Sequence, residues 1–207
     1  MSRNQRAGLR QGIIQTSLEI GSELGEEGLT MRGIAARLGV SATALYQHFE
    51  SKASILREIR LFGAELLQAE VVEPAAEISD PPARLRAMAS NYVVFARTHR
   101  WLYSVMMEHA QLDWSAMSGE ELELMLRPLK TCIQWLHEGE QHGVWRPDLN
   151  IDAAGFRLWL SMHGLCSLLN SGRIDEQHPV FPFADQDSFV EHFIADSVQA
   201  LCAVPSR

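Results

Sequence analysis

The sequence has few cysteines and no long apolar run. Its three cysteines, Cys132, Cys166 and Cys202, are odd in number and widely spaced, and no CxxC motif occurs among the 207 residues. This usage favours reduced core thiols over a disulfide framework. No segment reaches the roughly 18 consecutive apolar residues of a membrane helix, and the segment MSRNQRAGLRQG lacks the apolar core of a secretory signal. We therefore expect a cytoplasmic protein with no membrane partner.

Sequence motifs of common enzymes are also missing. The sequence contains no nucleophile elbow, no phosphate-binding loop and no H-E-x-x-H motif. Eight histidines are present, but pairs such as His137 and His142 lack the i, i+4 spacing of a helical zinc site. We expect no catalytic residue, no cofactor and no metal.

Charge is unevenly distributed along the chain. The net charge is −8, and 46% of the residues are hydrophobic, enough to bury the core of one large domain or two small ones. Residues 1–60 carry eight Lys and Arg against six Asp and Glu, whereas the remainder carries 10 against 20. Since nucleic-acid binding relies on basic surface, a polyanion should meet only the first sixty residues.

Apolar residues recur at helical spacing almost everywhere, and no sustained period-2 alternation occurs. A first helix runs from Leu9 to a stop at Gly25 and Gly28. Thr30 caps a second helix that ends at Gly39, and Ser41 caps a third. The predicted ranges of the third and later helices are 42–48, 51–72, 80–98, 100–112, 118–142, 151–171 and 185–203.

The third predicted helix has two contrasting faces. Val40, Leu45 and Phe49 point inward, whereas small or polar residues point outward. Two short helices joined by a tight glycine turn are typical of a helix-turn-helix. An outer face with so little bulk allows the backbone to approach another molecule closely.

Residues 25–56, GEEGLTMRGIAARLGVSATALYQHFESKASIL, resemble the DNA-binding segment of the tetracycline-repressor (TetR) family. The resemblance lies in T-x-x-x-I-A, G-V-S, L-Y-x-H-F and a lysine three residues later. LWLSMHGLCSLLNSGRI and NYVVFARTHRWLYSVMM are similar to the C-terminal domain of the family's WHG subtype. The sequence departs from the family pattern at Gly21, where a bulky aromatic is usual, and at Thr43 and Ala44, where glycine and a hydroxyl residue are common.

The resemblance implies an all-α fold with an N-terminal three-helix helix-turn-helix DNA-binding domain, followed by a larger helical ligand-binding and dimerisation domain. We expect the first domain over residues 1–50 and the second over 51–207, with the helix 51–72 as a connector.

In this family geometry the third helix enters the major groove. Gln47 has the amide that pairs with adenine, Thr43 offers both a hydroxyl and a methyl, and Ala42 and Ala44 suit thymine methyl groups. The resemblance assigns phosphate contacts to Thr30, Ser41, Tyr46, His48 and Lys52. The full predicted DNA-binding set is Thr30, Arg32, Ser41, Ala42, Thr43, Ala44, Tyr46, Gln47, His48 and Lys52.

Several of these residues have ordinary structural readings as well. Ala42 and Ala44 are good helix formers for any solvated face. Tyr46 also suits the core of the small domain, and His48 also suits local capping or packing.

By the same resemblance, a small hydrophobic or aromatic effector would lie among the helices spanning about 80–170. The predicted ligand-binding residues are Phe95, Tyr103, Met106, Trp135, Trp159 and His163. Aromatic and methionine positions at helical spacing are also typical of ordinary core, and His163 also suits a hydrogen bond to a backbone group.

The family dimerises through its last two long helices, here about 151–171 and 185–203. A two-fold dimer places two recognition helices roughly 34 Å apart, on an inverted-repeat operator in double-stranded DNA. We predict a homodimeric repressor that a ligand releases from DNA. An activator, a response to a partner protein, and a helical small-molecule-binding protein or enzyme without DNA binding are the alternatives.

Overall fold

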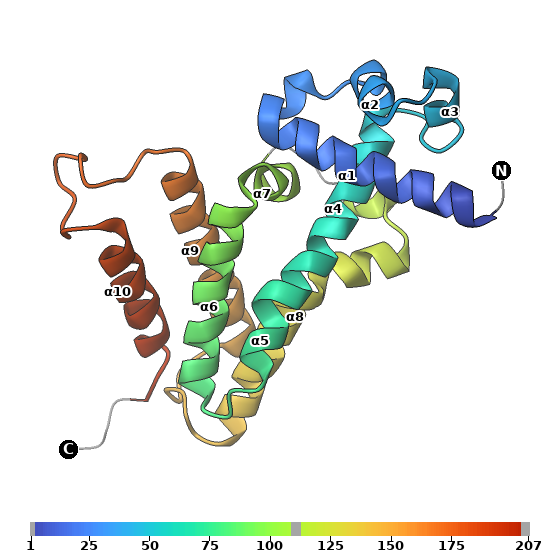
Figure 1. Ribbon diagram of the computed structural model, residues 1–207. Coiled ribbons are helices and arrows are strands. Elements are labelled where there is room, and N and C mark those ends of the chain that lie inside the picture. Colours follow the sequence, from blue (N-terminus) through green and yellow to red (C-terminus); the bar gives the residue numbers. More distant parts are fainter. Residues whose placement is uncertain (1–2, 109–112, 204–207) are drawn as a thin grey trace. The chain divides into compact units, whose positions relative to one another are not determined.

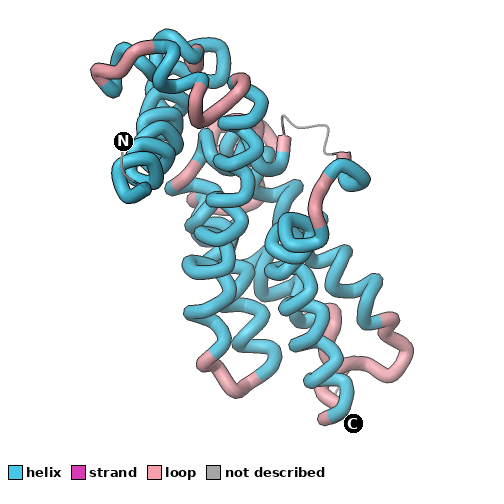
Figure 2. Tube along the Cα trace, turned by 90° about the vertical axis from the view of Figure 1, so that its right-hand side faces the viewer, coloured by secondary structure: helices cyan, strands magenta, loops and turns pink. Residues whose placement is uncertain are grey.

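The computed structural model describes residues 3–108 and 113–203. Every named element within these ranges is a helix (Figures 1 and 2). The one β-bridge there joins Trp145 to Cys202. The all-α prediction is confirmed. The last part of the helix predicted at 100–112, from residue 109, lies outside the described residues. Among the described helices, none is long and apolar enough to cross a membrane.

Contacts divide the chain into two compact units, which we describe separately. The first comprises the residues up to Glu65 together with His99–Met117, and the second comprises Leu66–Thr98 together with the residues from Ser118 onward. The expected division of function at residue 50 stays a prediction.

The first unit contains four complete α-helices and most of a fifth. These are α1 (Arg3–Gly28), α2 (Met31–Leu38), α3 (Ala42–Tyr46), α7 (Arg100–Met107) and the part of α4 (Lys52–Leu67) that ends at Glu65; a 3-10 turn, η2 (Trp114–Ala116), follows α7. Gly25 interrupts α1 with a φ of 71°. The core of this unit contains Ile13, Ile20, Leu29, Ile34, Leu45, Phe49, Ile55 and Ile59.

Two sequence predictions need correction here. The third helix ends at Tyr46 and not at His48, because the N–H groups of His48 and Phe49 both turn back to the Leu45 carbonyl and carry the Phe49 ring into the core. Val40, predicted to point inward, is only half-buried.

The predicted helix 51–72 is also not continuous. After α4 the chain forms a π-helix, η1 (Gln68–Val72), and then a short helix, α5 (Glu73–Ala76). The Glu73 N–H bonds to the Gln68 carbonyl, five residues back. Pro74 follows, and it has no N–H to continue an α-helical ladder. The wider turn therefore coincides with the point where proline interrupts the hydrogen bonds.

In the first unit, Gly21 gives Trp101 the space that a side chain on α1 would occupy. A Cβ atom built at Gly21 would lie 2.2 Å from the Trp101 indole ring. Trp101 belongs to α7, so the indole packs directly on the α1 backbone. The family's usual aromatic near this position is missing from α1, and an aromatic ring from another helix fills the same region.

The second unit contains the end of α4, η1, α5, α6 (Pro81–Thr98), α8 (Gly119–Gln141), α9 (Ile151–Asn170) and α10 (Gln186–Gln199). The helix predicted at 185–203 is shorter in the structure, where α10 ends at Gln199. Gly155 lets α9 approach α8, since a Cβ there would lie 2.6 Å from Ile133 Cγ1. Asn170 Nδ2 donates to the Ala96 carbonyl at 2.9 Å, which ties α9 to α6.

We expect Gly21→Ala to lower the free energy of unfolding by about 1–3 kcal/mol, because the added methyl overlaps the Trp101 ring. Chemical denaturation measures this change. Gly8→Ala is the matched control: Gly8 lies in the same helix, and a Cβ atom added there would meet no other atom within 4 Å, so alanine should stabilise by about 0.5–1 kcal/mol. Equal effects of the two substitutions would contradict the packing argument.

Candidate nucleic-acid interface

A left-handed glycine makes the turn between α2 and α3. Gly39 has a φ of 66°, a conformation that costs side-chain-bearing residues energy. Its N–H donates to the Ala36 carbonyl at 3.2 Å, and the Val40 N–H donates to the Ala35 carbonyl at 3.0 Å. These bonds end α2 and turn the chain directly into α3.

Hydroxyl side chains cap both helices of this pair. Thr30 Oγ1 accepts from the Gly33 N–H at 3.0 Å, and Ser41 Oγ accepts from the Ala44 N–H at 3.1 Å. Each cap satisfies one of the amides that a helix leaves unpaired at its start. Both predicted caps are present, and their oxygens stand at the exposed N-terminal ends of α2 and α3.

The two faces of α3 differ in exposure, as the sequence indicated. Leu45 is fully buried and Phe49 is 3% exposed. On the other side Ala42, Thr43 and Gln47 are exposed, and Tyr46 is 52% exposed. Ala44, predicted to point outward, is half-buried. His48 is half-buried as well, whereas Thr30, Arg32 and Ser41 are exposed.

Arg10 fixes the position of this surface, a role that the sequence analysis missed. Its guanidinium lies 4.6 Å from the centroid of the Phe49 ring and forms an ion pair with Glu58 at 2.6 Å. One side chain of α1 thus contacts the segment after α3 and also α4. The signal was available, because Arg10 stands three and four residues before the buried Ile13 and Ile14, on the inward side of its helix.

Lys52 has an internal partner. Its Nζ donates to the Glu26 carbonyl oxygen at 2.5 Å and lies 3.7 Å from the Glu26 carboxylate. Lys52 starts α4, and Glu26 is in the last turn of α1, so the contact joins the two helices. The predicted phosphate contact stays a prediction, and the side chain already has a structural role.

The cations of the first unit differ in how far they are neutralised. Arg37 donates two hydrogen bonds to Glu23, and they hold the pKa of that carboxyl below its ordinary value. Burial, with a smaller contribution from nearby Arg57, lowers the pKa of Arg60, which stays charged as arginine does in proteins. Arg32 is exposed, and within the described ranges it has no ion-pair partner. Arg32 is therefore available to meet an anion at the start of α2.

The six predicted ligand-binding residues fall in both units. Tyr103 and Met106 are buried in the first unit, where the Met106 sulfur lies against Gly63. Phe95 and Trp135 are buried in the second. Trp159 and His163, both half-buried on α9, stack with ring centroids 6.0 Å apart. A single ligand site shared by all six stays a prediction.

The buried Cys132 thiol is a poor nucleophile at neutral pH. Burial raises the pKa of Cys132 to about 12, so this thiol is protonated at neutral pH. Among the described residues, no group of three or more His, Cys, Asp or Glu side chains is arranged to hold a metal.

Comparison with known proteins places this geometry in a family. Residues 13–59 match the family model for bacterial regulatory proteins of the tetR family, and residues 85–196 match the tetracyclin repressor-like C-terminal domain. The second match alone covers more than half of the chain. The chain belongs to the TetR family. Neither match distinguishes the WHG subtype, which stays a prediction.

Curated relatives match the chain over different lengths. The HTH-type transcriptional repressor DrrR1 of Streptomyces coeruleorubidus is 32% identical over 56% of this chain and 43% of its own length. The tetracycline repressor protein class C of Escherichia coli is 49% identical over 23% of this chain and 22% of its own. The nucleoid occlusion factor SlmA of Marinobacter nauticus is 30% identical over 70% of this chain and 74% of its own. The matched segments thus span less than half the length of each of the first two relatives.

Solved structures share the whole fold. A Rhodococcus sp. RHA1 protein of unknown function superposes with a TM-score of 0.76 at 23% identity, over 94% of this chain and 96% of that one. The ketosteroid transcriptional regulator KstR2 of Mycobacterium tuberculosis gives 0.64 at 17% identity, over 99% and 98%. At these identities the likeness shows that this TetR-family chain has the same fold.

We expect Ser41→Ala to lower the free energy of unfolding by about 0.5–2 kcal/mol, because the Ala44 amide loses its side-chain acceptor. Ser41→Asp keeps an acceptor at the cap and should restore most of the loss. Ser22→Ala, on the exposed side of α1, is the control and should be neutral or slightly stabilising. The idea fails if Ser41→Ala unfolds at the same denaturant concentration as the wild type.

Proposed function

We propose that this TetR-family protein is a homodimeric transcriptional repressor that binds an inverted-repeat operator and leaves it when a small hydrophobic or aromatic ligand binds. The observation that carries the proposal is the exposed outer face of α3 on a capped, glycine-turned helix pair. The family membership and the repressor relatives support it. Binding to DNA, and not catalysis, is the proposed activity, and its place is the cytoplasm.

Recognition follows from the chemistry of this face. Ala42 and Thr43 add little bulk, so the start of α3 can approach the base edges of the major groove closely. Gln47 presents an amide that both donates and accepts, the pattern of adenine N6 and N7. Thr30 and Ser41, at the helix starts, and Arg32 are placed to contact phosphates, which set the register of the protein on the duplex. Tyr46, His48 and Lys52 complete the proposed phosphate contacts.

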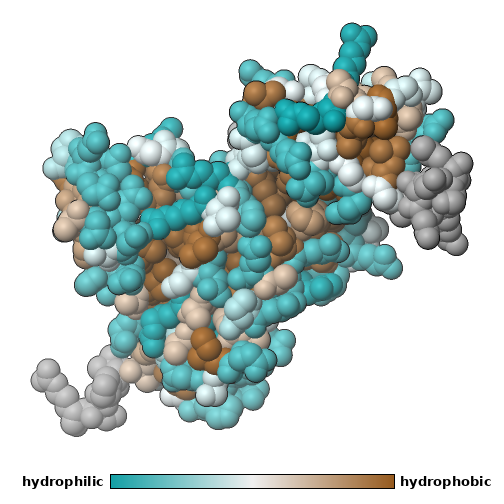
Figure 3. Space-filling model, viewed as in Figure 1, coloured by the Kyte–Doolittle hydropathy of each residue, from teal (hydrophilic) through white to brown (hydrophobic). Residues whose placement is uncertain are grey.

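The proposed dimer uses the exposed face of α9 together with α10. Phe156, Leu160 and Leu168 occur four and eight residues apart, and they are 49%, 47% and 40% exposed. Such spacing puts these three side chains on one side of α9. Other apolar residues also reach the molecular surface, where Figure 3 shows them in brown. Large apolar patches on a surface commonly mark an interface. A two-fold dimer presents two copies of α3 to successive major grooves.

Release by a ligand needs a difference in affinity between two states of the dimer. A ligand that binds better when the two α3 helices have the wrong spacing shifts the population away from DNA. A coupling free energy of about 1–3 kcal/mol is sufficient. α4 starts in the first unit and ends in the second, so the chain provides a direct covalent connection for this coupling.

We expect Gln47→Ala to relax base preference at one position per half-site, with a loss of about 1–3 kcal/mol of discrimination. Arg32→Ala should weaken binding to all sequences alike and reduce the slope of log affinity against log salt by about 1 per contact. Selection from a random duplex library followed by fluorescence anisotropy measures both effects. Gln141→Ala, exposed in the second unit, is the control.

If Gln47→Ala weakens every duplex equally, the assignment of Gln47 to base contact is wrong. The corresponding substitution of Lys52 needs a stability measurement beside it, because Lys52 also binds the Glu26 carbonyl.

We expect Leu160→Glu to convert the dimer to a monomer, since the new carboxylate would face an apolar partner surface. Sedimentation velocity measures the mass, and affinity for the inverted repeat should fall to that of a half-site. Leu24→Glu on α1 is the matched control, because Leu24 is also apolar and exposed, at 61%, but belongs to the first unit and not to the helices proposed to form the interface. A Leu160→Glu protein that stays dimeric would place the interface elsewhere.

A further inference from the structure

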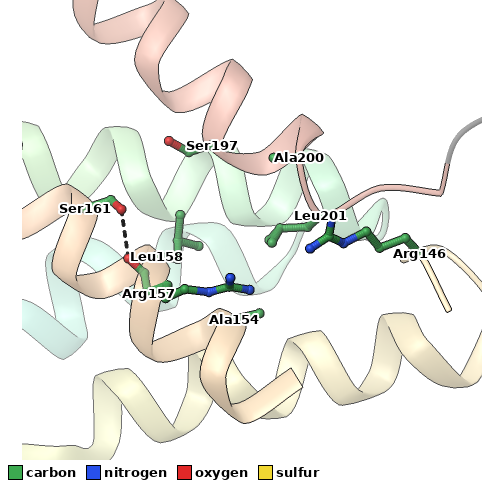
Figure 4. A pocket seen from close by; sticks show the side chains of 8 residues that line it. All are labelled: Arg146, Ala154, Arg157, Leu158, Ser161, Ser197, Ala200 and Leu201. Carbon is green, nitrogen blue, oxygen red and sulfur yellow. Dashed lines mark hydrogen bonds between the residues drawn. The ribbon is translucent and has the colours of Figure 1, made fainter. Parts of the chain in front are cut away.

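The second unit has a hollow between α9 and α10 that none of the predicted ligand-binding residues lines. Its volume is about 250 Å³ (Figure 4). Three apolar side chains form its inner wall: Ala154 and Leu158 from α9, and Leu201 from the segment after α10. All three are buried, whereas the arginines at the rim are exposed. The hollow therefore combines an apolar wall with a solvent-accessible entrance.

Two guanidinium groups converge on this hollow. Arg157 extends from α9 and Arg146 from the loop before it, and Figure 4 shows both side chains reaching into the same space. Asp148 lies 3.5 Å from the Nε of Arg146 and is itself largely exposed, so this ion pair is weak. In the described part of the chain, Arg157 has no ion-pair partner. Two cations that face one another repel, and an anion between them would relieve the repulsion.

The other polar groups of the hollow are already engaged as donors. Ser161 Oγ donates to the Arg157 carbonyl at 2.9 Å, and Ser197 Oγ donates to the Phe193 carbonyl at 2.6 Å. The donors left for a ligand are therefore the N–H groups of the two guanidinium forks. These forks match the planar geometry of a carboxylate, which accepts two parallel hydrogen bonds from one arginine.

We propose that this hollow binds a small carboxylate with an apolar body. The charged end would meet Arg146 and Arg157, and the apolar end would cover Leu158 and Leu201. The volume lies below the range of about 300–1,000 Å³ that is usual for drug-sized ligands, so a compact molecule fits best. An apolar wall gives no advantage to a fully hydrated inorganic anion. The proposal does not depend on DNA binding, because it concerns a site within the second unit.

Benzoate is the probe, and its binding to the intact chain is measured by isothermal titration calorimetry and ligand-observed NMR. We expect saturable binding with a dissociation constant below about 10 mM. This limit follows from the low end of the binding free energy per non-hydrogen atom that small ligands reach. Benzamide, which has the same shape without the charge, should bind at least tenfold more weakly.

Arg157→Gln should weaken benzoate binding at least tenfold. Arg157 is exposed, so the variant should fold, and its circular dichroism and melting temperature check this. Arg173→Gln is the matched control: Arg173 is exposed in the same unit but does not line the hollow, so affinity should not change.

The proposal is overturned if benzamide binds as tightly as benzoate, if Arg157→Gln and Arg173→Gln behave alike, or if benzoate does not bind. Sedimentation velocity with and without benzoate tests the other source of a carboxylate, an acidic side chain of a second copy. If benzoate dissociates a dimer and Arg157→Gln does the same, the hollow belongs to the partner copy and the small-molecule proposal is wrong.

Discussion

The burial of Leu45 and Phe49 is the interaction on which the DNA-facing surface depends. α3 has only five residues, far fewer than an isolated helix needs to persist in water. It is held by the Ser41 cap at one end and by the two buried side chains beneath it. Arg10 covers the Phe49 ring and binds Glu58, so α1 and α4 both support the same point. Without this packing the outer residues would have no fixed geometry.

Local sequence signals predicted most of the helices. Thr30 and Ser41 cap α2 and α3 as expected, and Gly39 adopts the left-handed turn. These features depend on neighbours within a few residues, which a sequence pattern contains. The incorrect predictions came from competing local hydrogen bonds or from contacts over longer range. Local bonds shorten α3 before Phe49 and form a π-helix before Pro74. The internal acceptor of Lys52, 26 residues away, has no local signature.

The departure from the family pattern at Gly21 has a packing explanation that sequence alone did not provide. Glycine in a helix interior costs about 1 kcal/mol relative to alanine. In this chain the cost is offset, because the Trp101 ring from α7 rests on the α1 backbone where a side chain would stand. An aromatic group thus still packs at this point of the first unit, supplied from a different helix. This contact between Trp101 and Gly21 can be predicted only when it is known that α1 and α7 pack together.

The division of α3 into a fixed inner side and an unconstrained outer side has an evolutionary consequence. Substitutions at exposed positions whose side chains form no capping bond usually change stability by less than about 0.5 kcal/mol. Thr43 and Gln47 are such positions, so mutation can sample new side chains there while the fold persists. After gene duplication, a copy of this chain could drift to a different target by one or two changes on a scaffold that tolerates them.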